Sequence, residues 1–167
     1  MVEVVPFTLV MTQAPGPCIL VLCPAEDYER HDTCRIVPIW MGAADAAQLG
    51  LAIEGKRLQR PMTHDLFLDA LTNLDAHVDH VLITRVEGKI FHSNIVLRAG
   101  ERTITLDARP SDSVSLAVRQ GSPIYMEDEV LKRASYPFVF KREKDDEEEL
   151  AEFHSFVESL DPDDFKD

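Results

Sequence analysis

Two short segments place charged side chains and a proline where an apolar, helix-periodic segment is expected to begin. They are RPMTHDL at residues 60–66 and DARPSDS at residues 107–113. Together they supply one histidine, three aspartates and two arginines, more charge than two helix starts need for stability. Imidazole, carboxylate and guanidinium groups are the side chains that transfer protons, hold divalent metals and bind phosphate. The two segments are therefore the candidate functional sites of the chain.

In the first segment, Thr63 is the expected N-cap of a helix, which places His64 and Asp65 at its first two positions. The helix dipole there disfavours a protonated imidazole and favours a carboxylate. A neutral His64 could act as a general base or a metal ligand, and Asp69 could join Asp65 in holding a divalent cation. The structural alternative is that Asp65 only complements the dipole and His64 bonds a nearby carbonyl.

In the second segment, Asp107 is expected to end a strand, and Ser111 is expected to cap the helix whose first turn holds Asp112. Pro110 favours an extended conformation at Arg109, which limits where the guanidinium can point. Arg109 could brace Asp107 or Asp112 through forked hydrogen bonds. It could instead face outward and bind a phosphate while the carboxylates hold a metal.

A concentrated basic patch lies just before the first segment and comprises Lys56, Arg57 and Arg60. Its charge suits contacts to phosphate groups, and it suits a solvated loop equally well. Trp40 ends an apolar strand, so we expect it in the core rather than on a surface where bases would stack.

The elements that must carry these segments follow from hydrophobic periodicity and from turn residues. The predicted strands cover residues 4–11, 18–23, 34–40, 78–86, 89–98, 102–107, 123–126 and 138–140, and the predicted helices cover 44–54, 63–74, 110–119 and 127–134, with a polar loop at 24–33. This order predicts an α+β fold with mixed, largely antiparallel sheets and three main helices. Two similar triplets each follow a strand and an acidic helix start, and they are Leu51-Ala52-Ile53 and Leu116-Ala117-Val118. One interpretation is a duplicated strand–helix unit. The other is chance similarity between two helices.

The chain has 167 residues and a net charge of −13, and this charge is uneven. Residues 1–140 carry 18 acidic and 13 basic side chains, whereas residues 141–167 carry 12 acidic and 4 basic ones. We expect one domain over residues 1–140 and an acidic C-terminal helical tail over residues 141–167. The apolar stripe of that tail comprises Leu150, Phe153, Val157 and Leu160. A single stripe favours a helix docked on its own domain over a helix that binds a partner.

The composition also bears on compartment and partners. No run approaches the roughly 18 apolar residues of a membrane span, and the first residues lack a signal-peptide pattern. We therefore expect a soluble, cytoplasmic protein without a membrane partner, whose Cys18, Cys23 and Cys34 are reduced thiols. The acidic balance lacks the broad basic footprint of a tight nucleic-acid binder. Exposed apolar strand edges would favour a homo-oligomer.

Several stretches resemble the bifunctional nuclease domain family, and they keep their order along the chain. They are PIWMG at residues 38–42, the helix at 45–55, RPMTHDL at 60–66, DARPSD at 107–112 followed by Leu116-Ala117, and PIY at 123–125. The resemblance spans roughly residues 2–135, and motifs in a fixed order argue against a chance match. It implies an α+β fold and a nuclease activity on both DNA and RNA, which has been assigned to plant members.

The resemblance also marks site residues, whose roles we infer from their chemistry. The predicted catalytic residues are His64, Asp65, Asp107 and Asp112; the predicted phosphate-binding residues are Arg60, Arg109 and Ser111; and the predicted ligands of a divalent Mg²⁺ or Mn²⁺ are Asp65 and Asp112. Such a metal-assisted nuclease requires the two helix starts to meet in space. The alternative is a non-catalytic ligand-binding or protein-binding regulatory domain, whose charged helix starts bind an anion or another protein.

Overall fold

The computed structural model describes residues 1–11, 16–30, 33–139 and 146–161. The strands are β1 (Val2–Val10), β2 (Cys18–Pro24), β3 (Thr33–Met41), β4 (Ala76–Glu87), β5 (Ile90–Ala99), β6 (Arg102–Ala108), β7 (Ile124–Met126) and β8 (Tyr136–Val139). The helices are α1 (Ala25–Arg30), α2 (Ala43–Ile53), α3 (Thr63–Asn73), α4 (Pro110–Gln120), α5 (Asp128–Ala134) and α6 (Asp146–Ser159). Within these ranges, no helix has the length and apolar character needed to cross a membrane.

The strands form one sheet of eight in the order β6-β5-β4-β7-β1-β2-β3-β8. All neighbouring pairs are antiparallel except β4 and β7, which are parallel. The meander predicted for residues 78–107 is β4, β5 and β6, joined by two tight turns. The expected α+β fold with a mixed, largely antiparallel sheet, three main helices and an acidic C-terminal helix is therefore confirmed.

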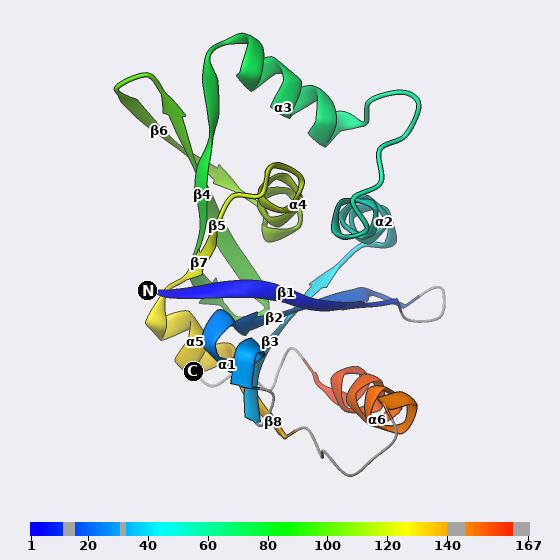
Figure 1. Ribbon diagram of the computed structural model, residues 1–167. Helices are drawn as coiled ribbons and strands as arrows, with labels where there is room; N and C mark the ends of the chain where they lie inside the picture. The colour runs from blue at the N-terminus through cyan, green and yellow to red at the C-terminus, as the bar shows by residue number, and fades with distance from the viewer. Residues whose placement is uncertain (12–15, 31–32, 140–145, 162–167) are drawn as a thin grey trace.

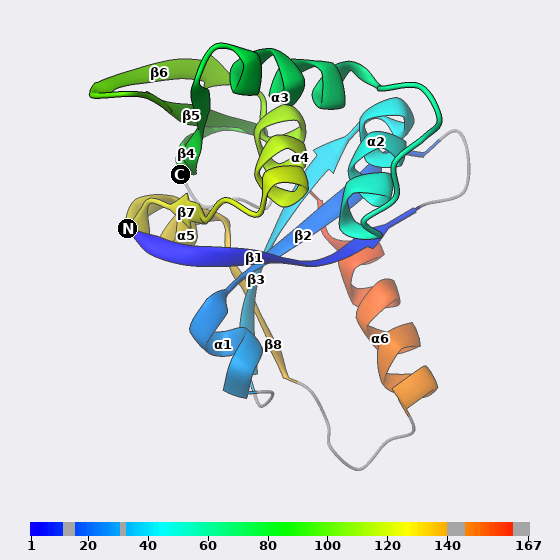
Figure 2. The ribbon, with the colours of Figure 1, turned by 45° about the horizontal axis from the view of Figure 1, so that its top comes forward.

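Strand β2 shows how the sheet acquires a core on both faces, because all seven of its residues are buried. Successive side chains of a strand point to opposite faces. Accordingly, Cys18, Leu20 and Leu22 join the larger core with α2, α3, α4 and α5, whereas Ile19, Val21 and Cys23 join a second core with α6. Figures 1 and 2 show α2, α3 and α4 on one side of β1 and β2, with α1 and α6 on the other.

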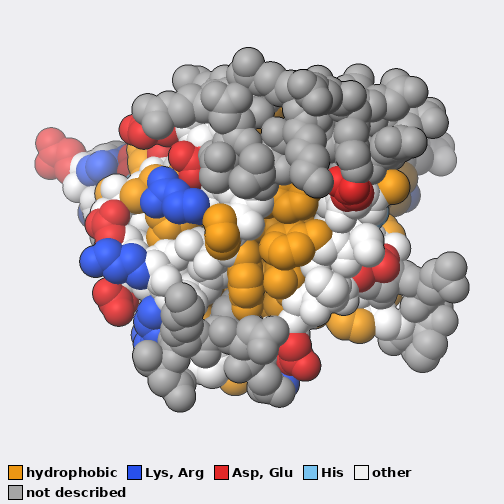
Figure 3. Space-filling model, turned by 90° about the horizontal axis from the view of Figure 1, so that it is seen from below, with side chains coloured by type: hydrophobic (Ala, Val, Ile, Leu, Met, Phe, Trp, Pro, Cys, Tyr) orange, Lys and Arg blue, Asp and Glu red, His pale blue; other side chains and the backbone are white. Residues whose placement is uncertain are grey.

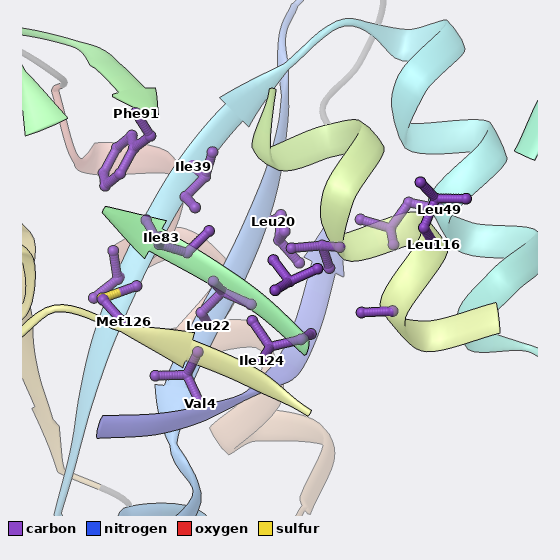
Figure 4. Packing of buried hydrophobic residues seen from close by; sticks show 14 of the residues in the cluster. Val4, Leu20, Leu22, Ile39, Leu49, Ile83, Phe91, Leu116, Ile124 and Met126 are labelled. Carbon is purple, nitrogen blue, oxygen red and sulfur yellow. The ribbon is translucent and has the colours of Figure 1, made fainter. Parts of the chain in front are cut away.

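The larger core positions the two helices that begin near the candidate site. Leu49 of α2 and Leu116 of α4 lie at the contact between these helices (Figure 4). Ile39 of β3 and Phe91 of β5 belong to the same core, near the ends of their strands. Burying these side chains together brings the starts of α2 and α4 to one side of the sheet.

The second core confirms that the tail helix docks on its own domain. Phe153 and Val157 of α6 are buried, and the Phe153 ring lies 4.7 Å from that of Phe138 and 5.1 Å from that of Phe7. Leu150, the first residue of the predicted apolar stripe, is exposed and does not belong to this core. On this side of the molecule, hydrophobic side chains gather near the middle of the surface (Figure 3). The first residues of the predicted tail, 141–145, lie outside the described residues.

Three local predictions differ from the structure. The expected polar loop contains α1, in which Asp27 accepts hydrogen bonds from the backbone N–H and the Nε–H of Arg35. The N-cap of α3 is Met62 rather than Thr63, because the carboxylate of Asp65 accepts the Met62 N–H at 3.0 Å. The N-cap of α4 is Arg109 rather than Ser111, because Pro110 suits the first helical position, where its missing N–H costs nothing. Residue 140 of the last predicted strand lies outside the described residues.

Candidate active site

The three helices α2, α3 and α4 share one local feature, because the third residue of each is an aspartate. These residues are Asp45, Asp65 and Asp112. A carboxylate in the first turn of a helix is favoured by the helix dipole and by the N–H groups that have no partner within the helix. In this fold each of the three carboxylates also contacts a side chain from another helix or its N-cap. These contacts hold the starts of the helices close to one another.

Arg109 links the starts of α2 and α4. Its Nε–H donates to Asp112 Oδ2 at 2.9 Å, and its two terminal nitrogens donate to the carboxylate of Asp45 at 3.2 and 3.3 Å. The Arg109 side chain is nevertheless 64% exposed. The hydrogen bond to Asp112 and the negative charges of Asp112 and Asp45 raise the pKa of Arg109, so its guanidinium stays charged. Arg109 is therefore a brace that still presents positive charge to solvent.

His64 links the start of α3 to the start of α4. Its Nε2 lies 3.3 Å from Asp112 Oδ1, across 48 positions of sequence. The other ring nitrogen, Nδ1, is buried and has no hydrogen-bond partner among the described residues. When Asp112 is ionised, Nε2 carries the proton, because a carboxylate can only accept. In this arrangement His64 holds Asp112 in place rather than facing solvent.

A second contact fixes α3 against α4 and α2. Arg119, in the last turn of α4, donates to Asp65 Oδ1 at 2.8 Å and to the backbone carbonyl of Gln48 at 3.2 Å. Both charged side chains of this pair are almost completely buried. Since Asp65 Oδ2 accepts the Met62 N–H, both oxygens of this carboxylate have a donor. Asp65 therefore determines where His64, the preceding residue, is held.

A pocket of about 320 Å³ opens between the starts of α2 and α4, and we call it the helix-start pocket. Its polar lining comes from Asp45, Arg109 and Ser111, and Lys89 lies in its wall. The remaining lining residues are Ile39, Trp40, Met41, Gly42, Ile90, Phe91 and Pro110. The pocket thus combines an exposed guanidinium and two helix starts, which suit an anion, with an apolar wall.

The comparisons with known proteins cover the elements that form this pocket. A family model described as "Bifunctional nuclease domain" matches residues 28–138, a range that includes α2, α3, α4 and every residue of the helix-start pocket. The chain belongs to the bifunctional nuclease domain family. Two uncharacterised proteins of Mycobacterium tuberculosis, from two strains, are each 37% identical over 139 residues. The aligned region is 79% of this chain and 82% of each relative.

In this bifunctional nuclease domain, the two predicted segments do meet. Residues His64 and Asp112 are in direct contact, and Arg109 and Ser111 line the helix-start pocket. The other predicted residues lie apart: Asp107 is exposed on β6, Arg60 is exposed on the connector before α3, and neither lines the pocket. The catalytic roles of His64, Asp65, Asp107 and Asp112 and the phosphate-binding roles of Arg60, Arg109 and Ser111 stay predictions.

The predicted metal ligands, Asp65 and Asp112, can be compared with the coordination that a divalent metal requires. Every oxygen of Asp65 and Asp112 already contacts a donor within the fold: Met62 and Arg119 for Asp65, His64 and Arg109 for Asp112. Across residues 1–11, 16–30, 33–139 and 146–161, no group of three or more His, Cys, Asp or Glu side chains is placed to hold a metal. Mg²⁺ and Mn²⁺ need several oxygen ligands. The donor set of the described residues therefore forms no ready metal site, and the Mg²⁺ or Mn²⁺ expected from the sequence stays an untested prediction.

Two residues of the site were not predicted, Asp45 and Arg119. Asp45 lines the helix-start pocket and binds Arg109, and Arg119 holds Asp65. For Asp45 a signal existed in the sequence, because it stands at an acidic helix start after a strand, as Asp112 does. For Arg119 the sequence offers no comparable signal, since its partner lies 54 positions away.

Proposed function

We propose that this protein is a nuclease that hydrolyses phosphodiester bonds of RNA or DNA at the helix-start pocket. The observation that carries the proposal is Arg109, which is held by Asp45 and Asp112 at the wall of the pocket and still presents an exposed guanidinium. Membership of the bifunctional nuclease domain family supports the same class of reaction. A guanidinium held in this way can make forked hydrogen bonds to a phosphate without first being ordered.

The substrate phosphate would be bound by three kinds of donor. Arg109 donates to its non-bridging oxygens, and the backbone N–H and the hydroxyl of Ser111 add neutral hydrogen bonds. The next two N–H groups of α4 already donate to the Arg109 carbonyl. Arg60, exposed on the connector before α3, provides a further contact to the chain of the substrate. These donors stabilise the negative charge that grows on the phosphate oxygens in the transition state.

Binding of the phosphate also frees a general base. In the structure, Arg109 forms ion pairs with Asp112 and Asp45. A phosphate that accepts hydrogen bonds from Arg109 breaks one of these two ion pairs and so releases one carboxylate. The freed carboxylate accepts a proton from a water molecule as the water oxygen attacks phosphorus. The bond between phosphorus and the leaving oxygen breaks, and the leaving oxygen takes a proton from solvent. His64 keeps Asp112 aligned during this step, and Asp65 keeps His64 in place.

The test is cleavage of labelled single-stranded RNA and DNA in Mg²⁺, in Mn²⁺ and in EDTA. The informative variant is Arg109→Gln/Asp112→Asn, and its matched control is Glu101→Gln/Arg102→Gln at the exposed β5–β6 turn. We expect the first variant to lose about 100-fold or more in rate, and the control to keep the rate of the parent protein. Activity that persists in EDTA would show that the predicted metal is not required.

Equal traces of cleavage in all three proteins would point to a contaminant and would contradict the proposal. Nucleic acid that binds to the parent protein without being cleaved would favour the alternative, a non-catalytic binding domain. The predicted homo-oligomer is a separate question, which light scattering coupled to size-exclusion chromatography answers. Strands β6 and β8 are the edges of the sheet and are where a second copy would add.

A further inference from the structure

We propose that the helix-start pocket binds one unpaired nucleotide, with the phosphate against Arg109 and Ser111 and the base against the apolar wall. The inference rests on the proposed function and names its substrate class, which is single-stranded or locally unpaired nucleic acid. Two parts of the pocket lining support it separately, the hydrogen-bond donors and the apolar side chains.

Among the hydrogen-bond donors of the pocket, Ser111 is the most informative residue. It is only 7% exposed, yet it lines the pocket, and its hydroxyl makes no hydrogen bond to any described residue. This hydroxyl is not among the buried polar atoms that lack a partner, so it is open to the pocket and can donate to a ligand there. Its own backbone N–H belongs to the first turn of α4, and Arg109 adds a full positive charge. These are the groups that a phosphate monoester or diester would engage.

The pocket also has an apolar lining, which a phosphate alone does not explain. The apolar residues there are Ile39, Met41, Ile90, Phe91 and Pro110. Ile90 is 65% exposed at the rim of the pocket, so a ligand bound there would cover its side chain. A nucleobase has two apolar faces and a polar edge, so it covers such a wall and keeps its edge in water. The pocket volume of about 320 Å³ lies in the range of small-molecule sites.

The charge of the protein separates this mode of binding from duplex binding. A protein that follows a duplex neutralises many phosphates with lysines and arginines, whereas this chain has a net charge of −13. Paired bases in a duplex are also stacked inside it and cannot reach a pocket wall unless they are flipped out. A single-nucleotide site needs few cations and draws its affinity from the base, so it suits an acidic protein.

The experiment measures binding in EDTA and does not depend on cleavage. Trp40 is the single tryptophan of the chain and lies in the pocket wall, so its fluorescence can follow titrations with adenosine monophosphate, adenosine and inorganic phosphate. Anisotropy of a labelled oligonucleotide compares a single strand with a hairpin duplex. We expect the single strand to bind about tenfold or more tightly than the duplex, and the monophosphate to bind more tightly than adenosine or phosphate.

Two variants separate the contribution of the apolar lining from that of the hydrogen-bond donors. Ile90→Ser is expected to weaken single-strand binding about fivefold or more and to leave phosphate binding unchanged. Ser111→Ala is expected to weaken both the monophosphate and inorganic phosphate. The control is Leu74→Ser, which changes an exposed leucine at the end of α3 that does not line the pocket. Circular dichroism checks that each variant is folded.

Equal affinity for single strand and duplex would overturn the inference, as would an Ile90→Ser variant that binds like the Leu74→Ser control. A lack of adenosine monophosphate binding at millimolar concentration would also overturn it. These failures differ from a failure of the proposed function. Cleavage of duplex as readily as single strand would keep the nuclease and reject the nucleotide pocket. Single-strand binding without any cleavage would keep the pocket and reject the nuclease.

Discussion

Arg119 donates a hydrogen bond from Nη1 to Oδ1 of Asp65 over 2.8 Å, and the two side chains are only 5% and 11% exposed. The same guanidinium donates to the backbone carbonyl of Gln48. One side chain at the end of α4 therefore holds the start of α3 and the middle of α2. Because His64 precedes Asp65 and contacts Asp112 at the other end of α4, this buried pair sets the geometry of the candidate site.

Arg119→Met is expected to destabilise the fold by about 3–5 kcal/mol, because it leaves the carboxylate of Asp65 buried without its charged partner. The matched control is Glu54→Gln, which breaks the exposed ion pair with Lys56 and should cost no more than about 1 kcal/mol. Urea unfolding followed by circular dichroism measures both. A cost for Arg119→Met as small as that of the control would mean that the buried pair does not hold the three helices together.

The double variant Asp65→Asn/Arg119→Met tests whether the two residues act as a pair. Removing both charges avoids the uncompensated carboxylate, so the double variant should be more stable than the sum of the two single variants predicts, by about 1 kcal/mol or more. The same urea titrations provide the four free energies of the cycle. Simple additivity would contradict the contact between Asp65 and Arg119.

Arg109→Lys is expected to lower nuclease activity by roughly 10-fold to 100-fold, because an ammonium cannot make forked hydrogen bonds to Asp45, Asp112 and phosphate. Stability should change by less than about 1 kcal/mol, since the ion pairs of Arg109 are exposed. Steady-state cleavage rates measure the effect, with Arg102→Lys on β6 as the control. Unchanged activity in Arg109→Lys would remove the main support for the proposed phosphate site.

Phe153→Ala is expected to destabilise the protein by about 3–5 kcal/mol, because it removes a fully buried ring that packs between Phe7 and Phe138. Leu150→Ala, on the same helix, changes an exposed side chain and should cost less than about 1 kcal/mol. Thermal unfolding compares the two. Similar melting temperatures for both variants would show that α6 does not dock on the sheet in solution.

The buried cysteines are expected to resist alkylation in the folded protein. The hydrogen bond with Cys34, together with burial, raises the pKa of the Cys23 thiol. At about pH 8, an ordinary cysteine with a pKa of about 8.5 begins to form the reactive thiolate. A cysteine with a raised pKa stays protonated at this pH and therefore does not react. Mass spectrometry after iodoacetamide treatment, with and without urea, measures the protection. Equal labelling in both conditions would contradict the burial of these residues.

Much of the fold could be predicted from local patterns. Apolar runs between turns identified the strands, and 3.6-residue periodicity identified α2, α3 and α4, because these patterns reflect which side of each element is buried. Helix α1 was missed, since six mostly polar residues carry no such periodicity, and Asp27 stabilises it through a contact with Arg35 in another element. The N-cap residues of α3 and α4 were misplaced by one and two positions, because Asp65 caps α3 from within the helix and Pro110 is the first residue of α4.

The sequence by itself determined that two charged helix starts exist and which side chains they carry, since His64, Asp65, Arg109 and Asp112 belong to local motifs. Only the tertiary structure decided which of these side chains meet. The burial of α2, α3 and α4 on one face of the sheet brings Asp45 to Arg109 across 64 positions and Arg119 to Asp65 across 54. Such pairs depend on the relative packing of whole helices, and no short-range pattern encodes that packing.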